Sequence, residues 1–282
     1  MNEARVVEPG HLYVVATPIG HLGDLSPRAA AVLRAADQVL AEDTRTTGLL
    51  LQQLGIQTAL LPLHEHNERA RADDLVKRLR EGAALALVSD AGTPLISDPG
   101  FVLVRSVREA GLPVIAVPGP CALVAALSIA GLPTDRFTFV GFLPPKSGPR
   151  RQALEALRGT PHTLVLYEAS HRIVDTAEAL AEVMGADRTV VLARELTKQF
   201  EQTVRCAAGD LGHWLRDNAN HQRGEFVLVV AGAPDADQDE ASARRTLQVL
   251  LRELPPSAAA RVAAELTGLP RKRLYALAME DF

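Results

Sequence analysis

SDAGTPLISDPG, residues Ser89–Gly100, is the stretch that decides the fold. An apolar run, Ala84–Val88, precedes it, and Phe101–Val104 opens a helical pattern after it. The sequence therefore predicts a strand, a loop stiffened by glycine and proline, and a helix. Such a loop lies at the carboxyl end of a strand, where open α/β sheets bind ligands. The alternative is a rigid connector whose helix is capped by Ser97 or Asp98.

Other apolar runs are also followed by a loop and a helical pattern, among them Leu12–Ala16, Val39–Ala41 and Pro113–Val117. After the first run, Ser26 and Pro27 are typical of an N-cap and the first residue of a helix. The loop between this run and Ser26 contains glycines but no GxGxxG motif, so the usual dinucleotide-binding fold is not supported. Alternating strands and helices predict an α/β fold.

The central motif resembles the signature of the small-subunit ribosomal RNA methyltransferases of the tetrapyrrole-methylase superfamily. The resemblance extends from Leu12 to Gly232 and includes the motifs AEDTR, YEASHR, ARELTK and GEFVLVV. It implies two α/β domains of the tetrapyrrole-methylase type, residues 1–119 and 120–233, with a cofactor cleft between them. It also implies methylation of the ribose 2′-oxygen of a cytidine in 16S ribosomal RNA, with S-adenosylmethionine as methyl donor and the assembled 30S subunit as substrate.

The same resemblance implies which residues contact the cofactor. Cys121 stands where most relatives have serine, and a thiol is a weaker hydrogen-bond donor than a hydroxyl. Tyr167 is expected to cover the adenine from the second domain. The full set of expected cofactor contacts is Pro18, Asp90, Gly92, Thr93, Pro94, Ile96, Gly119, Cys121, Ala122 and Tyr167.

Charged residues at strand ends and in one loop are the catalytic candidates. They would accept the proton of the 2′-hydroxyl group or stabilise the developing alkoxide. Asp43 or Thr44 would alternatively cap the helix that follows them. The candidates are Glu42, Asp43, Lys146, Glu195 and Lys198.

The segment Leu143–Arg151 has three cations and three prolines and is predicted to be an exposed loop that contacts RNA phosphates. The alternative is a solvated charged surface. His64 and His66 have a spacing that can bind metal, but no matched third ligand accompanies them, so no metal is expected. The expected substrate contacts are Arg45, His64, Asn67, Arg150, Arg151, Arg271, Lys272 and Arg273.

The last part of the chain is predicted to be a small helical domain, residues 240–282, after an acidic linker, Pro234–Glu240. Its three helical patterns, with Gly268 between the second and the third, are typical of a helix-turn-helix. From Glu240 onward there are seven Lys/Arg and five Asp/Glu, in a chain of net charge −4. This local positive charge is compatible with RNA contact, and a packing or dimerisation role is the alternative.

Composition limits the remaining choices. Two cysteines in 282 residues, no signal-peptide pattern and no apolar run of bilayer length predict a cytoplasmic protein without membrane contact. The superfamily usually pairs, and the nearly all-apolar stretch Ala122–Ala130 needs cover, so a homodimer is expected. Three alternative functions remain: a precorrin-type methyltransferase, a cofactor-sensing DNA-binding regulator and a nucleotide-binding structural protein.

Overall fold

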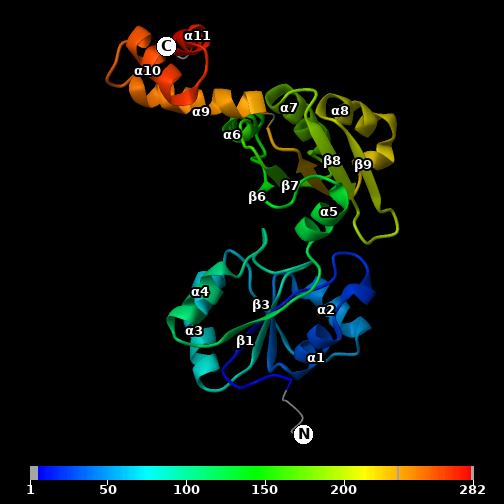
Figure 1. Ribbon diagram of the computed structural model, residues 1–282. Coiled ribbons are helices and arrows are strands. Elements are labelled where there is room, and N and C mark those ends of the chain that lie inside the picture. The colour runs from blue at the N-terminus through cyan, green and yellow to red at the C-terminus, as the bar shows by residue number, and fades with distance from the viewer. Residues whose placement is uncertain (1–5, 234, 281–282) are drawn as a thin grey trace. The chain divides into compact units, whose positions relative to one another are not determined.

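The computed structural model describes residues 6–233 and 235–280 (Figure 1). The chain forms two compact units. The first runs to Ser128 and includes Glu195–Gln202; the second comprises Ile129–Arg194 and the chain from Thr203 onward. The sequence predicted a boundary after residue 119 instead. The loop after Val117 stays with the first unit because the Thr93 hydroxyl donates to the Pro120 carbonyl at 2.9 Å.

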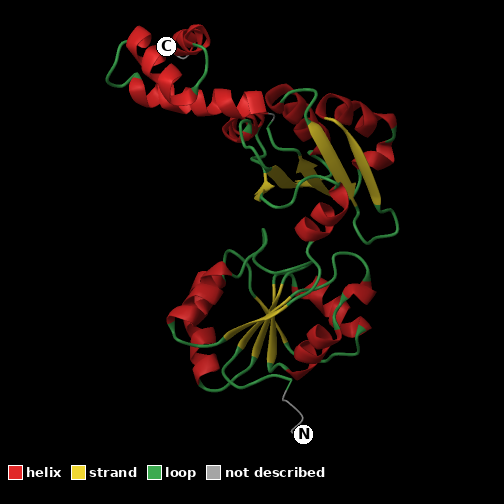
Figure 2. Ribbon diagram, in the orientation of Figure 1, coloured by secondary structure: helices red, strands yellow, loops and turns green. Residues whose placement is uncertain are grey.

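The first unit contains a parallel sheet of order β3-β2-β4-β1-β5. Its central strands β2, β4 and β1 are largely buried between two layers of helices, as expected for parallel sheets, and the edge strands β3 and β5 are partly exposed (Figure 2). The strands are β1 (Leu12–Val15), β2 (Gln38–Ala41), β3 (Leu60–Pro62), β4 (Leu85–Val88) and β5 (Val114–Val117).

Helices cover both faces of this sheet (Figure 1). One face carries α1 (Pro27–Ala35) and α2 (Thr44–Gln53), which share one apolar core. The other carries α3 (Glu68–Arg80) and α4 (Phe101–Glu109) over a second core. The predicted cap of α1 is confirmed, because the Ser26 hydroxyl accepts from the Ala29 N–H at 3.0 Å. A short 3₁₀ helix, η1 (Leu22–Asp24), precedes it.

The second unit has a mixed sheet of order β6-β7-β10-β8-β9, with β10 antiparallel to both neighbours. Helix α5 (Ala122–Ala130) begins in the first unit and ends in the second. The further elements are β6 (Phe137–Phe142), α6 (Ser147–Leu157), β7 (Thr163–Ala169), α7 (Ile173–Met184), β8 (Thr189–Arg194), β9 (Gln202–Ala207), α8 (Ala208–Asp217), η2 (Ala219–Gln222) and β10 (Glu225–Val230).

Three helices follow, and Gly268 ends the second of them in the left-handed region, at φ 74°. The acidic stretch expected to be a linker is instead helical from Asp235. This stretch contains Ala, Gln and Glu, which have high intrinsic helix propensity. The helices, which enclose their own apolar core, are α9 (Asp235–Leu250), α10 (Pro256–Thr267) and α11 (Arg271–Glu280). None of the helices described is long and apolar enough to cross a membrane.

Candidate active site

The loops after β1 and β4 meet at the carboxyl edge of the parallel sheet. Thr17 and Gly92 form an isolated antiparallel bridge, with N–H to O=C distances of 2.9 and 3.1 Å. The two strands are neighbours, yet they lead to helices on opposite faces, so their loops diverge just beyond this bridge. Open α/β sheets bind ligands at such a point.

The loop after β4 holds an unusual backbone conformation. Gly92, Leu95, Ser97 and Gly100 have φ values of 85°, 74°, 69° and 125°. A non-glycine residue in this region costs on the order of 1–3 kcal/mol, and such strain concentrates at functional sites. At Gly100 a Cβ would also lie 2.8 Å from the Leu87 Cδ2 atom. The loop is therefore more than a plain strand-to-helix connector.

A third loop, after β5, is tied to the same place. The hydrogen bond from Thr93 to Pro120 links it to the loop after β4. At Gly92 a Cβ would lie 3.2 Å from the Ile19 Cγ2 atom and 3.7 Å from the Pro120 oxygen. The space next to Gly92 is open only because this residue has no side chain. Gly119, in the loop after β5, is exposed. Together the loops form a cradle of small residues with accessible backbone groups.

All expected cofactor contacts except one lie in these three loops of the first unit. The exception, Tyr167, lies on β7 of the second unit. Its ring contacts those of Phe139 and Phe142, with centroids 5.0 and 5.8 Å away. The other residues are Pro18, Asp90, Gly92, Thr93, Pro94, Ile96, Gly119, Cys121 and Ala122.

Carboxylates gather beside the cradle, at the ends of β2 and β4. Burial raises the pKa of Glu42, and the charges of Asp90 and Asp98 raise it further. Burial and Asp90 also raise the pKa of Asp98 to about 6, against the lowering effect of a hydrogen bond from Ser89. Groups that repel one another in this way favour a ligand with positive charge or hydroxyl donors. The sequence analysis considered Asp98 only as a helix cap. The presence of both Asp90 and Asp98 in the Ser89–Gly100 motif was the feature that could have identified it as a site residue.

Asp43 turns out to be a helix cap. Its carboxylate accepts from the Arg45 backbone N–H at 2.8 Å and pairs with the Arg45 guanidinium at 2.8 Å. These hydrogen bonds lower the pKa of Asp43 to about 2. A carboxylate with so low a pKa is a weak proton acceptor near neutral pH. The capping alternative therefore describes Asp43, and the catalytic one is disfavoured. Arg45 remains exposed.

The His64–Asn67 loop closes on itself. The Asn67 side chain accepts from the His64 backbone N–H at 2.9 Å, donates to the Pro62 carbonyl at 3.1 Å and contacts the His64 ring at 3.1 Å. These local bonds leave the Asn67 amide little capacity for a substrate. Within the described parts of the chain no group of three His, Cys, Asp or Glu is placed to hold a metal ion.

The segment Glu195–Gln202 brings two further candidates to the first unit. The Lys198 ammonium pairs with the Glu195 carboxylate at 2.9 Å. The Thr197 hydroxyl accepts from the His21 N–H at 3.1 Å, in the loop after β1. Glu195 and Thr197 both have positive φ, 51° and 64°. The structure thus places the Lys198–Glu195 pair against a loop of the cradle. Thr197 belongs to the motif ARELTK, but nothing in the sequence predicted that Thr197 and Gly20 would contact each other.

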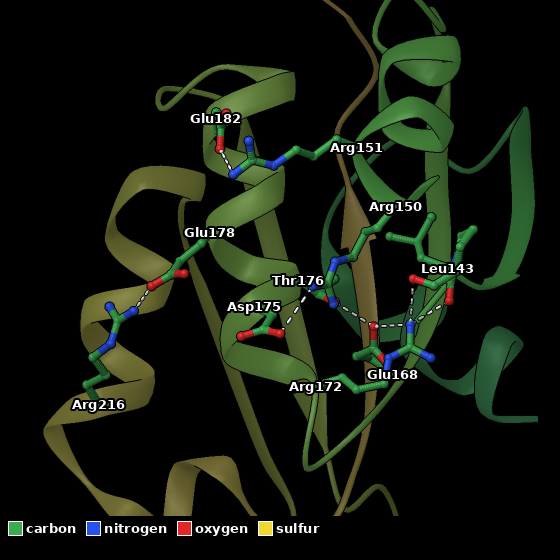
Figure 3. Close-up of polar contacts among 11 residues, drawn as sticks. Leu143, Arg150, Arg151, Glu168, Arg172, Asp175, Thr176, Glu178, Glu182 and Arg216 are labelled. Carbon is green, nitrogen blue, oxygen red and sulfur yellow. Dashed lines mark hydrogen bonds and ion pairs between the residues drawn. The ribbon is translucent and has the colours of Figure 1, made fainter. Parts of the chain in front are cut away.

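The predicted exposed loop at Leu143–Arg151 is partly wrong. Helix α6 begins at Ser147, and the Arg150 side chain is only 4% exposed because it pairs with Asp175 at 3.1 Å (Figure 3). Arg150 is therefore unavailable to RNA. Arg151 is half-exposed and pairs with Glu182. Lys146 and Arg151 are the cations of this stretch that stay exposed as predicted.

The basic residues that open α11 lie on the surface of the last helices. Arg271, Lys272 and Arg273 are all exposed. The Arg271 guanidinium donates to the Ser257 hydroxyl on α10 at 3.2 Å. The N-terminus of α11 adds partial positive charge to theirs.

The sequence matches two family models. Residues 11–212 match the model described as tetrapyrrole (corrin/porphyrin) methylases, and residues 237–281 match the RsmI C-terminal HTH domain. Among curated proteins, ribosomal RNA small subunit methyltransferase I of Escherichia coli O157:H7 is 52% identical, over 96% of both chains. The protein of the same name from Synechocystis is 46% identical, over 96% of this chain and 98% of that one.

Solved structures share the fold. Uroporphyrin-III-C-methyltransferase of Thermus thermophilus is similar at 26% identity with a TM-score of 0.56, over 79% of this chain and 94% of that one. The methyltransferase CobJ is similar at 19% identity with a TM-score of 0.59, over 79% and 95% of the two chains.

Proposed function

We propose, from the premise that the chain belongs to the tetrapyrrole methylase family and is an S-adenosylmethionine-dependent methyltransferase, that its substrate is small-subunit ribosomal RNA. The acceptor in this proposal is the ribose 2′-oxygen of a cytidine in 16S ribosomal RNA, presented by the assembled 30S subunit. Relatives that are 46% and 54% identical carry the name ribosomal RNA small subunit methyltransferase I. The proposed substrate places the enzyme in the cytoplasm.

The cradle of the first unit is the observation that supports this function most directly. Its residues fit S-adenosylmethionine. The glycines leave space that a Cβ would fill, and the carboxylates of Asp90 and Asp98 suit hydroxyl and ammonium groups. Bound there, S-adenosylmethionine supplies a methyl group on a positively charged sulfur atom. The protein contributes mainly alignment, for which the strained and cross-linked loops are suited.

Two kinds of residue would serve the acceptor. Glu42 would accept the proton of the 2′-hydroxyl group, because its raised pKa brings it nearer to neutral pH than Asp43. Lys146 and Lys198 would stabilise negative charge on the oxygen. Glu195 would hold Lys198 through their ion pair. The exposed Arg45, Arg151 and the basic start of α11 would contact RNA phosphates.

The alternative functions are less well supported. A precorrin-type methyltransferase would not need the C-terminal residues 237–281, which match a domain found with the ribosomal RNA enzymes. A cofactor-sensing DNA-binding regulator would have no use for the raised pKa of Glu42 at the strand ends.

We also propose a homodimer. Val124 and Ile129 on α5 are 59% and 49% exposed, and Phe137 and Phe142 on β6 are 42% and 53% exposed. Exposed apolar side chains of this kind would be covered by a second copy. Sedimentation of the protein at tens of micromolar, roughly the working range for a stable interface, tests this, and a monomer there would contradict it.

The central experiment is methyl transfer to ribosomal subunits. Small subunits from a strain that lacks the enzyme would be incubated with the protein and labelled S-adenosylmethionine. We expect label in 16S ribosomal RNA on a cytidine ribose. Label on a tetrapyrrole, or on no RNA under conditions where the cofactor binds, would overturn the proposal.

A further inference from the structure

A buried ionic network lies beneath the Lys146 loop, defined as residues 143–149. The Glu168 side chain on β7 is fully buried, at 0% exposure, and pairs with Arg172 at 3.1 Å. Its carboxylate also accepts from the Thr176 hydroxyl at 2.6 Å (Figure 3). It accepts from the Ala169 N–H as well, at 2.9 Å. The negative charge of Glu168 is therefore matched by donors on β7, on α7 and in the turn between them.

Arg172 connects this network to the loop. Its guanidinium donates to the backbone carbonyls of Leu143 and Pro144, while the same group is held by Glu168 (Figure 3). Arginine presents several donors in a rigid fork, so it can bind a carboxylate and carbonyl oxygens at once. The residues just before Lys146 are thereby fixed to a buried charge.

Arg150 fixes the other side of the loop. Its guanidinium donates to the Asp175 carboxylate at 3.1 Å and to the Thr176 hydroxyl at 3.4 Å, and Thr176 in turn bonds Glu168. Leu143 and Arg150 are buried, whereas the residues from Pro145 to Pro149 are exposed. One connected set of hydrogen bonds therefore anchors both ends of the exposed segment that carries Lys146.

We propose that Arg172, held by Glu168, is a positioning residue that sets the direction in which Lys146 is presented to RNA. This inference rests on the proposed function, because that function assigns Lys146 to the RNA. Arg172 touches no reacting atom in this role. Burial of a charge pair costs desolvation, so its retention here points to a need for a defined loop conformation.

The test compares Arg172→Ala, Arg172→Lys and Lys146→Ala with the wild type and with the double variant. Arg216→Ala is the matched control, since Arg216 pairs with Glu178 in an exposed contact between α8 and α7 of the same unit. Methylation of small subunits is measured as kcat and KM, and S-adenosylhomocysteine affinity by calorimetry. Arg172→Lys keeps the charge without the fork and serves if Arg172→Ala does not fold.

We expect kcat/KM to fall roughly tenfold to a hundredfold in Arg172→Ala, the range for a misplaced group. The loss should come mostly through kcat, because the proposed function has Lys146 stabilise charge on the acceptor oxygen, and cofactor affinity should be unchanged. Arg172→Lys should lie between it and the wild type. Little further loss is expected when Arg172→Ala is added to Lys146→Ala, because the two changes act on the same contact. Fully additive effects would overturn the proposal.

Tryptic cleavage after Lys146 supplies a readout that does not involve RNA. Loss of the anchor should speed this cut, identified by fragment mass, and Arg216→Ala should leave it unchanged. A wild-type cleavage rate in folded Arg172→Ala and Arg172→Lys would overturn the anchoring itself. Faster cleavage together with wild-type methylation by Lys146→Ala would instead refute the RNA role that the proposed function gives Lys146, and with it the positioning role.

Discussion

The two α/β units treat charge in opposite ways. In the first, Glu42, Asp90 and Asp98 lie together at strand ends, where burial and neighbouring carboxylates raise the pKa of Glu42 and of Asp98. In the second, the carboxylate of Glu168 is buried more deeply, yet it is surrounded by donors from Arg172, Thr176 and the backbone. The first arrangement leaves negative charge for a ligand to satisfy; the second satisfies its charge internally and gains a rigid loop.

The backbone shows the same difference. The non-glycine residues with positive φ in the described parts of the chain are Leu95, Ser97, Glu195 and Thr197, and all belong to the first unit. Strain persists only where surrounding structure enforces it. The cross-links from Thr93 and Thr197 supply that enforcement. We infer that the first unit is built around a bound ligand, and that the second is built to present one exposed segment.

Replacement of a cradle residue should give the largest effect. Thr93→Arg places a long cation where the hydroxyl of Thr93 now joins two loops, and it should weaken S-adenosylhomocysteine binding by at least about 100-fold, or 2.7 kcal/mol. Calorimetry measures this. The control is Thr203→Arg on the exposed face of β9 in the second unit, which should bind normally. Equal affinity in both folded variants would remove the distinction between the units.

A smaller loss is expected when the contact between Gly20 and the Glu195–Gln202 segment is broken. A Cβ at Gly20 would lie 2.4 Å from the Lys198 Cγ atom and 3.1 Å from the Leu196 oxygen. Gly20→Ala should displace the Lys198–Glu195 pair and lower kcat on the order of tenfold. Gly48→Ala on α2, where a Cβ would meet only the Leu60 Cδ1 atom at an ordinary 3.6 Å, is the control. Wild-type kcat in Gly20→Ala would show that this contact is incidental.

Removal of the last three helices should weaken methylation of the RNA substrate and leave cofactor binding unchanged. The α/β part of the second unit ends at Ala233, which is buried and whose N–H donates to the Thr160 carbonyl at 2.7 Å. Protein truncated after Ala233 should keep its cofactor affinity and lose methylation of 30S subunits several-fold. Its activity should also fall less steeply with salt, because Arg271, Lys272 and Arg273 are gone. Identical salt slopes for both proteins would assign the tail a packing or dimerisation role.

The smallest effect concerns the pH dependence of stability. Asp98 has its pKa raised to about 6 in the folded state, above its unfolded value, so its favourable contribution is present below about pH 4 and lost as pH rises through 6. At pH 8, Asp98→Asn should therefore unfold roughly 2–4 °C higher than wild type, which corresponds to about 1 kcal/mol of unfolding free energy after solvent screening. At pH 4 the variant and the wild type should unfold at the same temperature.

The comparison variant is Glu168→Gln in the second unit. It should lower the unfolding temperature at pH 8, because Arg172 would lose its buried partner. Both temperatures come from circular dichroism. A destabilised Asp98→Asn at pH 8 would mean that the carboxylates of the first unit are compensated after all.

Local sequence determined much of the architecture. Short apolar runs followed by glycine and proline predict strands and turns, so β1, β2, β4 and β5 were predicted near their observed positions. Ser26 with Pro27 caps α1, and Gly268 ends α10, because capping depends on a few adjacent residues. The motif Ser89–Gly100 likewise marked the strained loop by its composition.

Tertiary structure decided the partners of each charge. The sequence reads Arg150 as a cation in a basic loop, but Asp175 and Thr176, far along the chain, bury it. The sequence suggests that Asp98 is a helix cap, whereas in the fold its burial and the charge of Asp90 raise its pKa. Glu195 and Lys198 follow a strand of the second sheet, and only the fold assigns them to the first unit. Electrostatic energy depends on distance and burial, and both are set by contacts between residues that are remote in sequence.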